Sequence, residues 1–207
     1  MLLATSDIQI LQLYSRSLAY HNVYHPLELL ELHATGKTRG IEIQNYTGGP
    51  RILDEWAAND LIRAIVCHDV VYVPGAPKGK NERASFDKWC EVSRCRPSKL
   101  LEALVMATAS HDPNSVDVHE SERQIVEHMI DLDMSPLAST REEFDRNSAN
   151  VAQEFMTLGY TPDECRVGRL KFFESVLKQD RIFFTTLFHD ALEAKARQNM
   201  IEDINNG

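Results

Sequence analysis

The stretch Leu61-Ile-Arg-Ala-Ile-Val-Cys-His-Asp69 shows the residue pattern on which the expected architecture of this chain depends. Leu61, Ile65 and His68 follow one another at spacings of four and three residues, which places them on one face of a helix. Elsewhere, too, apolar residues recur at these spacings far more often than in alternation, and β-branched runs are few. The sequence therefore predicts an all-α protein.

Helices are expected along most of the chain, on both sides of this stretch. We predict them from Ser6-Asp7 to Leu18, from Pro26 to about Ala34, from about Asp54 to Val71, and over 81–94, 97–110 and 119–133. Two capping boxes, Ser139-Thr-Arg-Glu142 and Thr161-Pro-Asp-Glu164, begin later helices, and Gly159 ends the helix between them. Two more helices complete the chain.

Two segments interrupt the helical pattern. The segment from Thr35 to Arg51 holds four glycines and a proline, so we expect a loop with one short strand at most. The segment Val73-Pro-Gly-Ala-Pro-Lys-Gly-Lys80 holds two prolines and two glycines and is predicted to be a loop beside His68-Asp69. No repeat and no shift in composition marks a boundary, which favours one helical bundle over residues 1–207.

The composition excludes several classes of protein. The 207 residues suffice to bury a core, and 31 acidic against 22 basic residues give a formal net charge of -9. That charge argues against a protein that holds a DNA backbone or an anionic membrane. No apolar run approaches the roughly 18 residues of a membrane helix, and the chain does not start like a signal peptide. We expect a soluble, cytoplasmic protein with neither nucleic acid nor membrane as its partner.

Three of the predicted helices carry an apolar stripe that ends in an ionisable residue. Leu61 and Ile65 lead to His68 and its neighbour Asp69, Leu104 leads to His111, and Val126 with Met129 or Ile130 leads to Asp133. A buried carboxylate or imidazole costs several kcal/mol unless it is paired or bound to a cation. Residues of this kind that converge on one core therefore need partners, and a metal ion supplies one.

Each of these residues also has a simpler interpretation. A lone histidine such as His111 is more often a hydrogen-bonded packing residue than a ligand, and Asp133 could cap the following turn. At the carboxyl end of a helix, however, an aspartate opposes the helix dipole, which favours a compensating cation. The remaining histidines are expected to be ordinary surface or helix-end residues without a role in function: His33, His119, His128 and His189.

A set of short motifs gives the dipeptide His68-Asp69 its weight. The motifs are Tyr20-His-Asn-Val-Tyr-His25, Cys67-His-Asp-Val-Val-Tyr-Val-Pro-Gly-Ala-Pro77, Asn81-Glu-Arg-Ala-Ser85, Ala107-Thr-Ala-Ser-His111, Asp131-Leu-Asp-Met-Ser135, Tyr160, Gly168-Arg169 and Ala196-Arg-Gln-Asn199. Their order resembles that of the HD superfamily of metal-dependent phosphohydrolases, over most of the chain. The resemblance implies a helical HD domain with a Gly/Pro-rich loop at its active site.

The resemblance implies a set of metal ligands, which are His25, His68, Asp69 and Asp133. His25 matches better than His21, because a helix begins at Pro26, and His21 then contacts substrate or supports a ligand. Asp133 matches better than Asp131, which stays in reserve, since Met-Ser follows where the family has Leu-Ser. Two imidazoles and two carboxylates suit a divalent ion such as Mn²⁺, Mg²⁺, Fe²⁺, Co²⁺, Ni²⁺ or Zn²⁺.

The same resemblance implies roles in catalysis and in substrate binding. Glu82 would position or deprotonate the attacking water, although a glutamate in the first turn of a helix is also stabilised by the dipole alone. His111 would protonate the leaving group or bind a second metal ion. Lys78, Lys80 and Arg83 could reach a phosphate from the loop, or could simply be solvated. For Arg169 we favour a structural pairing with a core carboxylate over contact with substrate.

The function that follows is hydrolysis of a phosphate ester of a nucleotide or of a similar small phosphorylated metabolite. A non-catalytic nucleotide-binding or regulatory protein on an HD scaffold is the first alternative. An all-α interaction domain, whose histidines only pack, is the second and predicts no stoichiometric metal. The substrate, the choice of metal and the oligomeric state, a homo-oligomer included, stay open.

Overall fold

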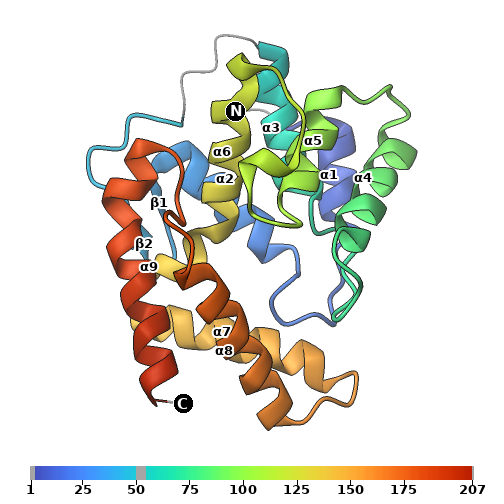
Figure 1. Cartoon of the computed structure of the whole chain (residues 1–207). Helices are drawn as coiled ribbons and strands as arrows, with labels where there is room; N and C mark the ends of the chain where they lie inside the picture. Colours follow the sequence, from blue (N-terminus) through green and yellow to red (C-terminus); the bar gives the residue numbers. More distant parts are fainter. Residues whose placement is uncertain (1–2, 50–54, 207) are drawn as a thin grey trace.

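The computed structural model describes residues 3–49 and 55–206, and most of these residues lie in helices (Figure 1). The helices are α1 Thr5–Leu11, α2 Tyr24–Thr35, α3 Glu55–Cys67, α4 Lys80–Ser93, α5 Lys99–Ala107, α6 Arg123–Met134, α7 Arg141–Met156, α8 Pro162–Leu177 and α9 Thr186–Asn206. Short 3-10 turns are η1 Pro113–Ser115, η2 Glu120–Glu122 and η3 Ser135–Ala138, and a hairpin pairs β1 Lys37–Thr38 with β2 Ile41–Glu42. The predicted all-α fold is confirmed.

The helix α6 joins two groups of helices. On one side α1, α3, α4 and α5 pack against one another, and on the other α7 and α9 pack against α8, with η3 against α9 (Figure 1). The predicted apolar stripes face inward, since Leu61, Ile65, Leu104 and Met129 are all fully buried in one connected core. Burial of such a side chain contributes about 1.5–3 kcal/mol. Among the helices of the described ranges, none combines the length and apolar composition that a bilayer crossing requires.

Several helices end earlier than the sequence predicts. The first ends at Leu11, and Tyr14 lies beyond it, buried, with its hydroxyl donating to the carbonyl oxygen of Val66 at 3.0 Å. The third ends at Cys67, so that His68 and Asp69 follow the helix directly; its predicted start at Asp54 lies outside the described residues. Two functional candidates therefore lie at a helix end, where the backbone is free to turn.

The helices around His111 are likewise shorter than predicted. The helix α5 ends at Ala107, and His111 follows it with a φ of 50°, in the left-handed region that non-glycine residues rarely adopt. Residues Glu120–Glu122 form the 3-10 turn η2, with His119 as its N-cap, rather than the first turn of α6. Pairing of His111 with Asp133, described below, accompanies this unusual backbone conformation.

The two predicted capping boxes differ in outcome. At the start of α8, the Thr161 hydroxyl accepts from the Glu164 N–H at 3.2 Å, and Glu164 accepts from the Thr161 N–H at 2.8 Å. At the start of α7 the prediction is wrong, because Thr140 is the N-cap residue and the Ser139 hydroxyl donates to the Pro136 carbonyl oxygen. The turn η3 presents that carbonyl to Ser139. The predicted loop of residues 35–51 also differs, since its described part contains two short strands rather than one.

Candidate metal centre

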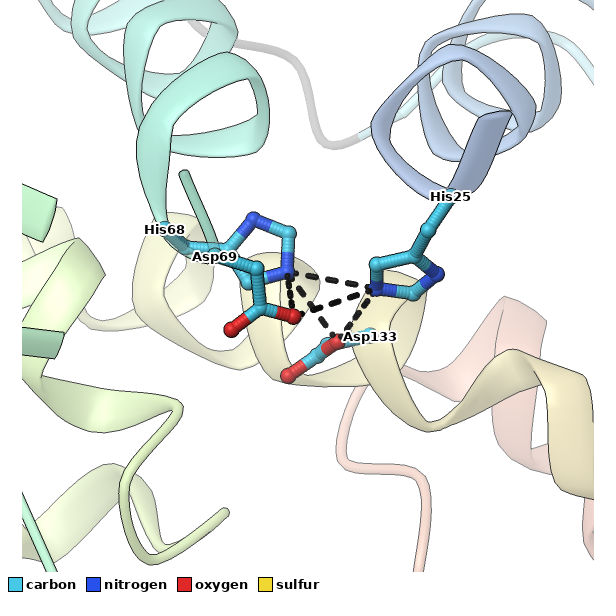
Figure 2. Close-up of side chains that lie close together, drawn as sticks. All are labelled: His25, His68, Asp69 and Asp133. Atoms are coloured by element: carbon cyan, nitrogen blue, oxygen red, sulfur yellow. Dashed lines mark hydrogen bonds and ion pairs between the residues drawn. The ribbon is translucent and has the colours of Figure 1, made fainter. Parts of the chain in front are cut away.

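Four side chains from different parts of the chain converge at one point of the core (Figure 2). His25 comes from the first turn of α2, His68 and Asp69 follow α3, and Asp133 lies in the last turn of α6. One ligand atom from each, imidazole nitrogen or carboxylate oxygen, lies within 4.8 Å of all the others. The structure thus brings together the four residues that the HD resemblance implies as ligands, and the cluster could hold a metal ion.

The spacing of the donor atoms fits coordination of one ion. The Nε2 atoms of His25 and His68 lie 3.3 Å apart, and both are within 3.4 Å of the Asp133 Oδ1 atom. The Asp69 Oδ2 atom lies 3.3 Å from the Nε2 atom of His68 and 3.8 Å from that of His25. Donors at about 2.1 Å from a common ion are about 3.0–3.4 Å apart in octahedral or tetrahedral geometry. Only small shifts would therefore be needed to bind an ion.

Local hydrogen bonds orient the two imidazoles. The Nδ1 atom of His68 lies 3.0 Å from the Ile65 carbonyl oxygen, which accepts its proton and leaves the Nε2 lone pair for the cluster. The Asn22 side chain donates to two carbonyl oxygens of the preceding loop and accepts from the Tyr24 N–H at 2.9 Å. Asn22 thereby fixes the entry into α2 and the direction of His25. These contacts give a physical reason for the Tyr-His-Asn-x-x-His motif.

The electrostatics of the cluster favour a cation. Burial alone lowers the pKa of His68, but the carboxylates of Asp69 and Asp133 outweigh it and hold this pKa well above its ordinary value. Burial alone would raise the pKa of Asp69, yet the neighbouring His68 lowers it to about 2. The pKa of Asp133 is likewise lowered, against burial, by the imidazoles that face it. Two carboxylates with side chains only 12% exposed need positive charge between them, which a divalent ion supplies.

His111 supports a ligand instead of joining the cluster. Its Nε2 atom lies 3.1 Å from Oδ2 of Asp133, the oxygen that faces away from the other donors. An imidazole that donates to a coordinating carboxylate fixes the orientation of that carboxylate. The same side chain lines the cavity described below. His111, which the sequence singled out, contacts Asp133, but it lies after α5 and not on the inner face of that helix.

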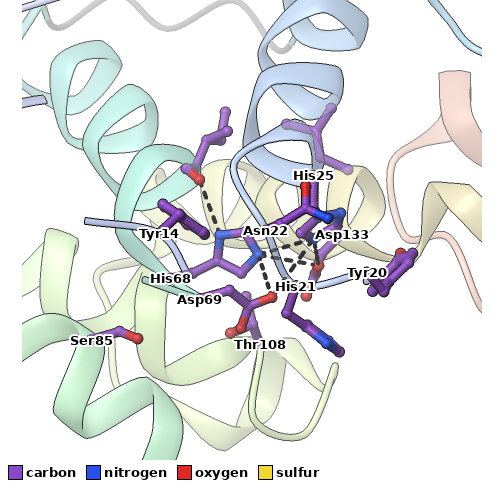
Figure 3. Close-up of polar contacts among 12 residues, drawn as sticks. Tyr14, Tyr20, His21, Asn22, His25, His68, Asp69, Ser85, Thr108 and Asp133 are labelled. Atoms are coloured by element: carbon purple, nitrogen blue, oxygen red, sulfur yellow. Dashed lines mark hydrogen bonds and ion pairs between the residues drawn. The ribbon is translucent and has the colours of Figure 1, made fainter. Parts of the chain in front are cut away.

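Two side chains of α4 hold the loop after His68-Asp69, and Figure 3 labels one of them, Ser85. The Ser85 hydroxyl accepts from the Val71 N–H at 3.0 Å and donates to the Val71 carbonyl oxygen at 3.2 Å. The Asn81 amide pairs in the same way with both backbone groups of Val73, at 3.1 and 3.2 Å. The Asn-Glu-x-x-Ser motif therefore clamps the Gly/Pro-rich loop onto α4. This clamp fixes the backbone next to His68 and Asp69.

The predicted catalytic and phosphate-binding residues separate into two groups. Glu82 lines the same cavity as the cluster, and burial raises its pKa. Lys78 and Lys80 are exposed, and Arg83 pairs with Glu102 at 2.7 Å. Neither Lys78 nor Arg83 is among the described residues of the cavity wall. The structure thus places Glu82 beside the cluster and directs the Arg83 guanidinium away from it.

His21 is held by a carboxylate that the sequence did not single out. Glu154, on α7 and almost fully buried, accepts from the N–H groups of Tyr20 and His21 at 2.6 and 2.8 Å. Its second oxygen lies 2.7 Å from Nδ1 of His21, whose ring stacks on Tyr72. Against the effect of burial, these hydrogen bonds lower the pKa of Glu154. No motif pointed to Glu154, since its sequence separation from His21 exceeds 130 residues.

Asp131, the reserve ligand, faces away from the cluster. Its carboxylate accepts from the N–H groups of Phe184 and Thr185, at 2.7 and 2.9 Å, and from the Thr185 hydroxyl. It therefore holds the segment that leads into α9. The two aspartates lie two residues apart on a helix, so they point in different directions. Asp133, and not Asp131, reaches the cluster.

One expectation about the remaining histidines is wrong. His128 was expected at the surface or a helix end, yet it is only 1% exposed, with its Nε2 atom 3.0 Å from Nδ1 of His33. Burial lowers the pKa of His128 to about 3 and lowers that of His33. The reason is the packing of α6 on α2, which no local pattern specifies. His119 is exposed and caps η2, as a helix-end residue should.

Arg169 has the structural partner that we favoured. Its Nε atom donates to Oδ2 of Asp203 at 3.0 Å, and the Arg141 guanidinium reaches the other oxygen at 3.2 Å. Asn199, from the same helix as Asp203, donates to the carbonyl oxygens of Leu137 and Ser139. These contacts tie α9 to α7, α8 and η3, and Arg169 also lines the cavity.

Comparison of the chain with protein-family models, with curated proteins and with solved structures gave no match.

Proposed function

We propose that this protein is a metal-dependent phosphohydrolase of the HD type, acting in the cytoplasm on a phosphate ester of a nucleotide or of a similar small metabolite. The observation that carries the proposal is the meeting of His25, His68, Asp69 and Asp133 at ligand distances. All of these except His68 line a cavity that Glu82 also lines. The order of motifs along the chain supports it independently. A purely structural cluster would not need two carboxylates within reach of two imidazoles.

The donor set favours a hard or borderline divalent ion. It contains nitrogen and oxygen atoms and no thiolate, which suits Mn²⁺, Mg²⁺, Fe²⁺, Co²⁺, Ni²⁺ or Zn²⁺. When bound, such an ion lowers the pKa of water and polarises a phosphoryl oxygen. The four residues leave coordination positions for both, because six-coordinate ions accept two further donors.

Three side chains of the protein have further roles in the proposed reaction. Glu82 lines the cavity that the cluster faces, where its carboxylate could accept a proton from the attacking water. His21 has its Nδ1 atom engaged by Glu154, so its Nε2 atom is left to contact the substrate or leaving group. His111 has its Nε2 atom engaged by Asp133, and we therefore assign it to holding that ligand rather than to a second metal ion.

A phosphatase screen tests the proposal. The metal-free protein is supplied in turn with Mn²⁺, Mg²⁺, Co²⁺ and Ni²⁺ and assayed for phosphate release from phenyl phosphate and from nucleoside monophosphates. We expect release that requires a divalent ion. In Glu82→Gln we expect the rate to fall about 100-fold or more, with the metal content unchanged. Metal binding without release from any ester would contradict the proposal and favour the non-catalytic nucleotide-binding alternative.

A further inference from the structure

A cavity of about 550 Å³ extends from the metal centre to the hairpin of α7 and α8. Its volume lies within the range of pockets that bind small organic molecules. At one end it is lined by His25, Asp69 and Asp133, together with Glu82 and His111. A ligand that reaches the metal centre therefore has its remaining atoms in the rest of this cavity.

The end of the cavity away from the metal centre is mainly aromatic and aliphatic, although Asn147, Ser148, Glu164 and Arg169 also line it. Its wall there comes from η3, α7 and α8 and includes Leu137, Phe144, Val151, Phe155, Phe172 and Phe173. Such a wall gains free energy by removing apolar surface of a ligand from water, by about 25 cal/mol for each Å². It offers little to a ligand group that carries charge, because a charge taken out of water needs a partner.

The charged side chains of the cavity wall also limit how much negative charge a ligand can carry. Of the described residues that line it, Arg169 is the one with a permanent positive charge, and its guanidinium already pairs with Asp203. Four carboxylates line the same cavity, those of Asp69, Glu82, Asp133 and Glu164. A divalent ion at the cluster would coordinate one phosphate group directly, but further phosphates would face the carboxylates of Glu82 and Glu164 without a cation.

We propose that this cavity selects phosphate monoesters whose alcohol part is uncharged and mainly apolar, and that it discriminates against polyphosphates. The inference rests on the proposed function and narrows its substrate class. In the reaction, the water oxygen forms a bond to phosphorus while the bond from phosphorus to the ester oxygen breaks. One proton of the water passes to the departing alcohol, and inorganic phosphate remains.

The selectivity is tested with two esters that have similar leaving groups. Phenyl phosphate and 1-naphthyl phosphate differ mainly by one fused ring, so their intrinsic reactivities are close. We expect kcat/KM for the naphthyl ester to be about tenfold higher, which corresponds to burial of roughly 60 Å² of additional apolar surface. ATP should be turned over more slowly than either. Equal values for the two aryl esters, or faster turnover of ATP, would overturn the inference.

A variant of α8 tests whether the cavity is responsible. Gly168 lines the cavity, and a Cβ atom added there would meet no atom within 4 Å. Gly168→Leu therefore occupies cavity space without a clash, and leucine favours a helix more than glycine does. We expect this variant to reduce the naphthyl preference from about tenfold to about twofold. The control is Val167→Leu on the same helix, because Val167 is 43% exposed and not on the described wall.

Binding measurements separate this inference from the proposed function. If the metal-loaded protein releases no phosphate from any ester, the proposed hydrolysis fails, and affinities are then measured by calorimetry with the same two esters. A tenfold tighter binding of 1-naphthyl phosphate that Gly168→Leu removes and Val167→Leu preserves would support the apolar site alone. Equal affinities of the two esters, or an unchanged preference in Gly168→Leu, would overturn it.

Discussion

Two pairs of histidines lie in contact inside this protein, and they differ in their surroundings. In the first pair the rings of His25 and His68 are 5.3 Å apart, and in the second the rings of His33 and His128 are 5.2 Å apart. Both pairs join α2 to a neighbouring part of the core. The geometry of two imidazoles in contact therefore does not by itself distinguish a metal site.

The difference between the pairs is the presence of carboxylates. Asp69 and Asp133 face the first pair and hold the pKa of His68 well above its ordinary value, despite burial. Around the second pair burial dominates, and it lowers the pKa of both His33 and His128. The carboxylates beside the first pair thus favour a positive charge at that site, whereas burial favours the neutral form of the imidazoles in the second pair. The comparison teaches that the carboxylates, more than the imidazoles, define the candidate metal centre.

The largest expected effect comes from removing one imidazole of each pair. In His68→Gln we expect the affinity for Mn²⁺ to fall about 100-fold or more, because a ligand is lost and even its supporting partners are worth 10- to 100-fold. In His128→Gln we expect a change of less than about twofold. Isothermal titration calorimetry measures both, with circular dichroism as the check on folding. Equal losses in the two variants would remove the distinction between the pairs.

The second effect is the pH dependence of stability that the neutral pair causes. Below pH 6.5 the unfolded chain protonates His128, whereas the folded chain does so only at about pH 3. The free energy of unfolding therefore falls as the pH falls from 6.5, by about 1.4 kcal/mol for each pH unit from this group. Urea unfolding from pH 6.5 to pH 4 should show a smaller slope in His128→Gln than in the wild type. Identical slopes would show that His128 is protonated in the folded protein.

A smaller effect is expected at His111, which supports Asp133 from outside the cluster. Without its hydrogen bond the carboxylate is free to rotate, and in His111→Ala we expect the Mn²⁺ affinity to fall about tenfold. His119→Ala is the matched control, because that imidazole is exposed and caps η2. A loss as large as that in His68→Gln would instead make His111 a ligand.

The smallest expected effect concerns the loop that follows α3 and contains His68. Only the first histidine pair depends on such a loop. His33 and His128 lie within helices, whereas His68 depends on the loop that Ser85 clamps to α4. In Ser85→Ala we expect the free energy of unfolding to fall by about 1–2 kcal/mol, since two part-buried hydrogen bonds are lost. Ser175→Ala, at an exposed position of α8, should change it by less than about 0.5 kcal/mol. Similar values for both would assign Ser85 no clamping role.

The features that the sequence predicted correctly are those that residues close together in the chain determine. Helical spacing identified the buried faces that carry Leu61 and Leu104, and the reciprocal hydrogen bonds of Thr161 and Glu164 need only four consecutive residues. The four residues of the candidate metal centre were implied by the resemblance of the motif order to the HD superfamily, and the local contacts of Asn22 fix the entry into α2 next to one of them, His25. These features depend on short stretches of chain.

The features that the sequence did not predict depend on contacts between distant segments. Glu154 carries no local sign of its hydrogen bonds to His21, and burial of His128 follows from how α6 meets α2. The Ser139 box failed because α7 begins one residue later, with Thr140 as its N-cap, and the Ser139 hydroxyl instead donates to the Pro136 carbonyl oxygen of the turn η3. The apolar cavity, too, arises only when α7 and α8 pack beside the metal centre. Each case requires knowledge of which helix faces meet.

Pulsed electron paramagnetic resonance of the protein loaded with one equivalent of Mn²⁺ tests the central claim most directly. The account predicts a single bound ion per chain whose spectrum shows coupling to imidazole nitrogens, with part of that coupling lost in His25→Gln and part in His68→Gln. A spectrum of hydrated Mn²⁺ without nitrogen coupling, or one that neither substitution alters, would contradict it.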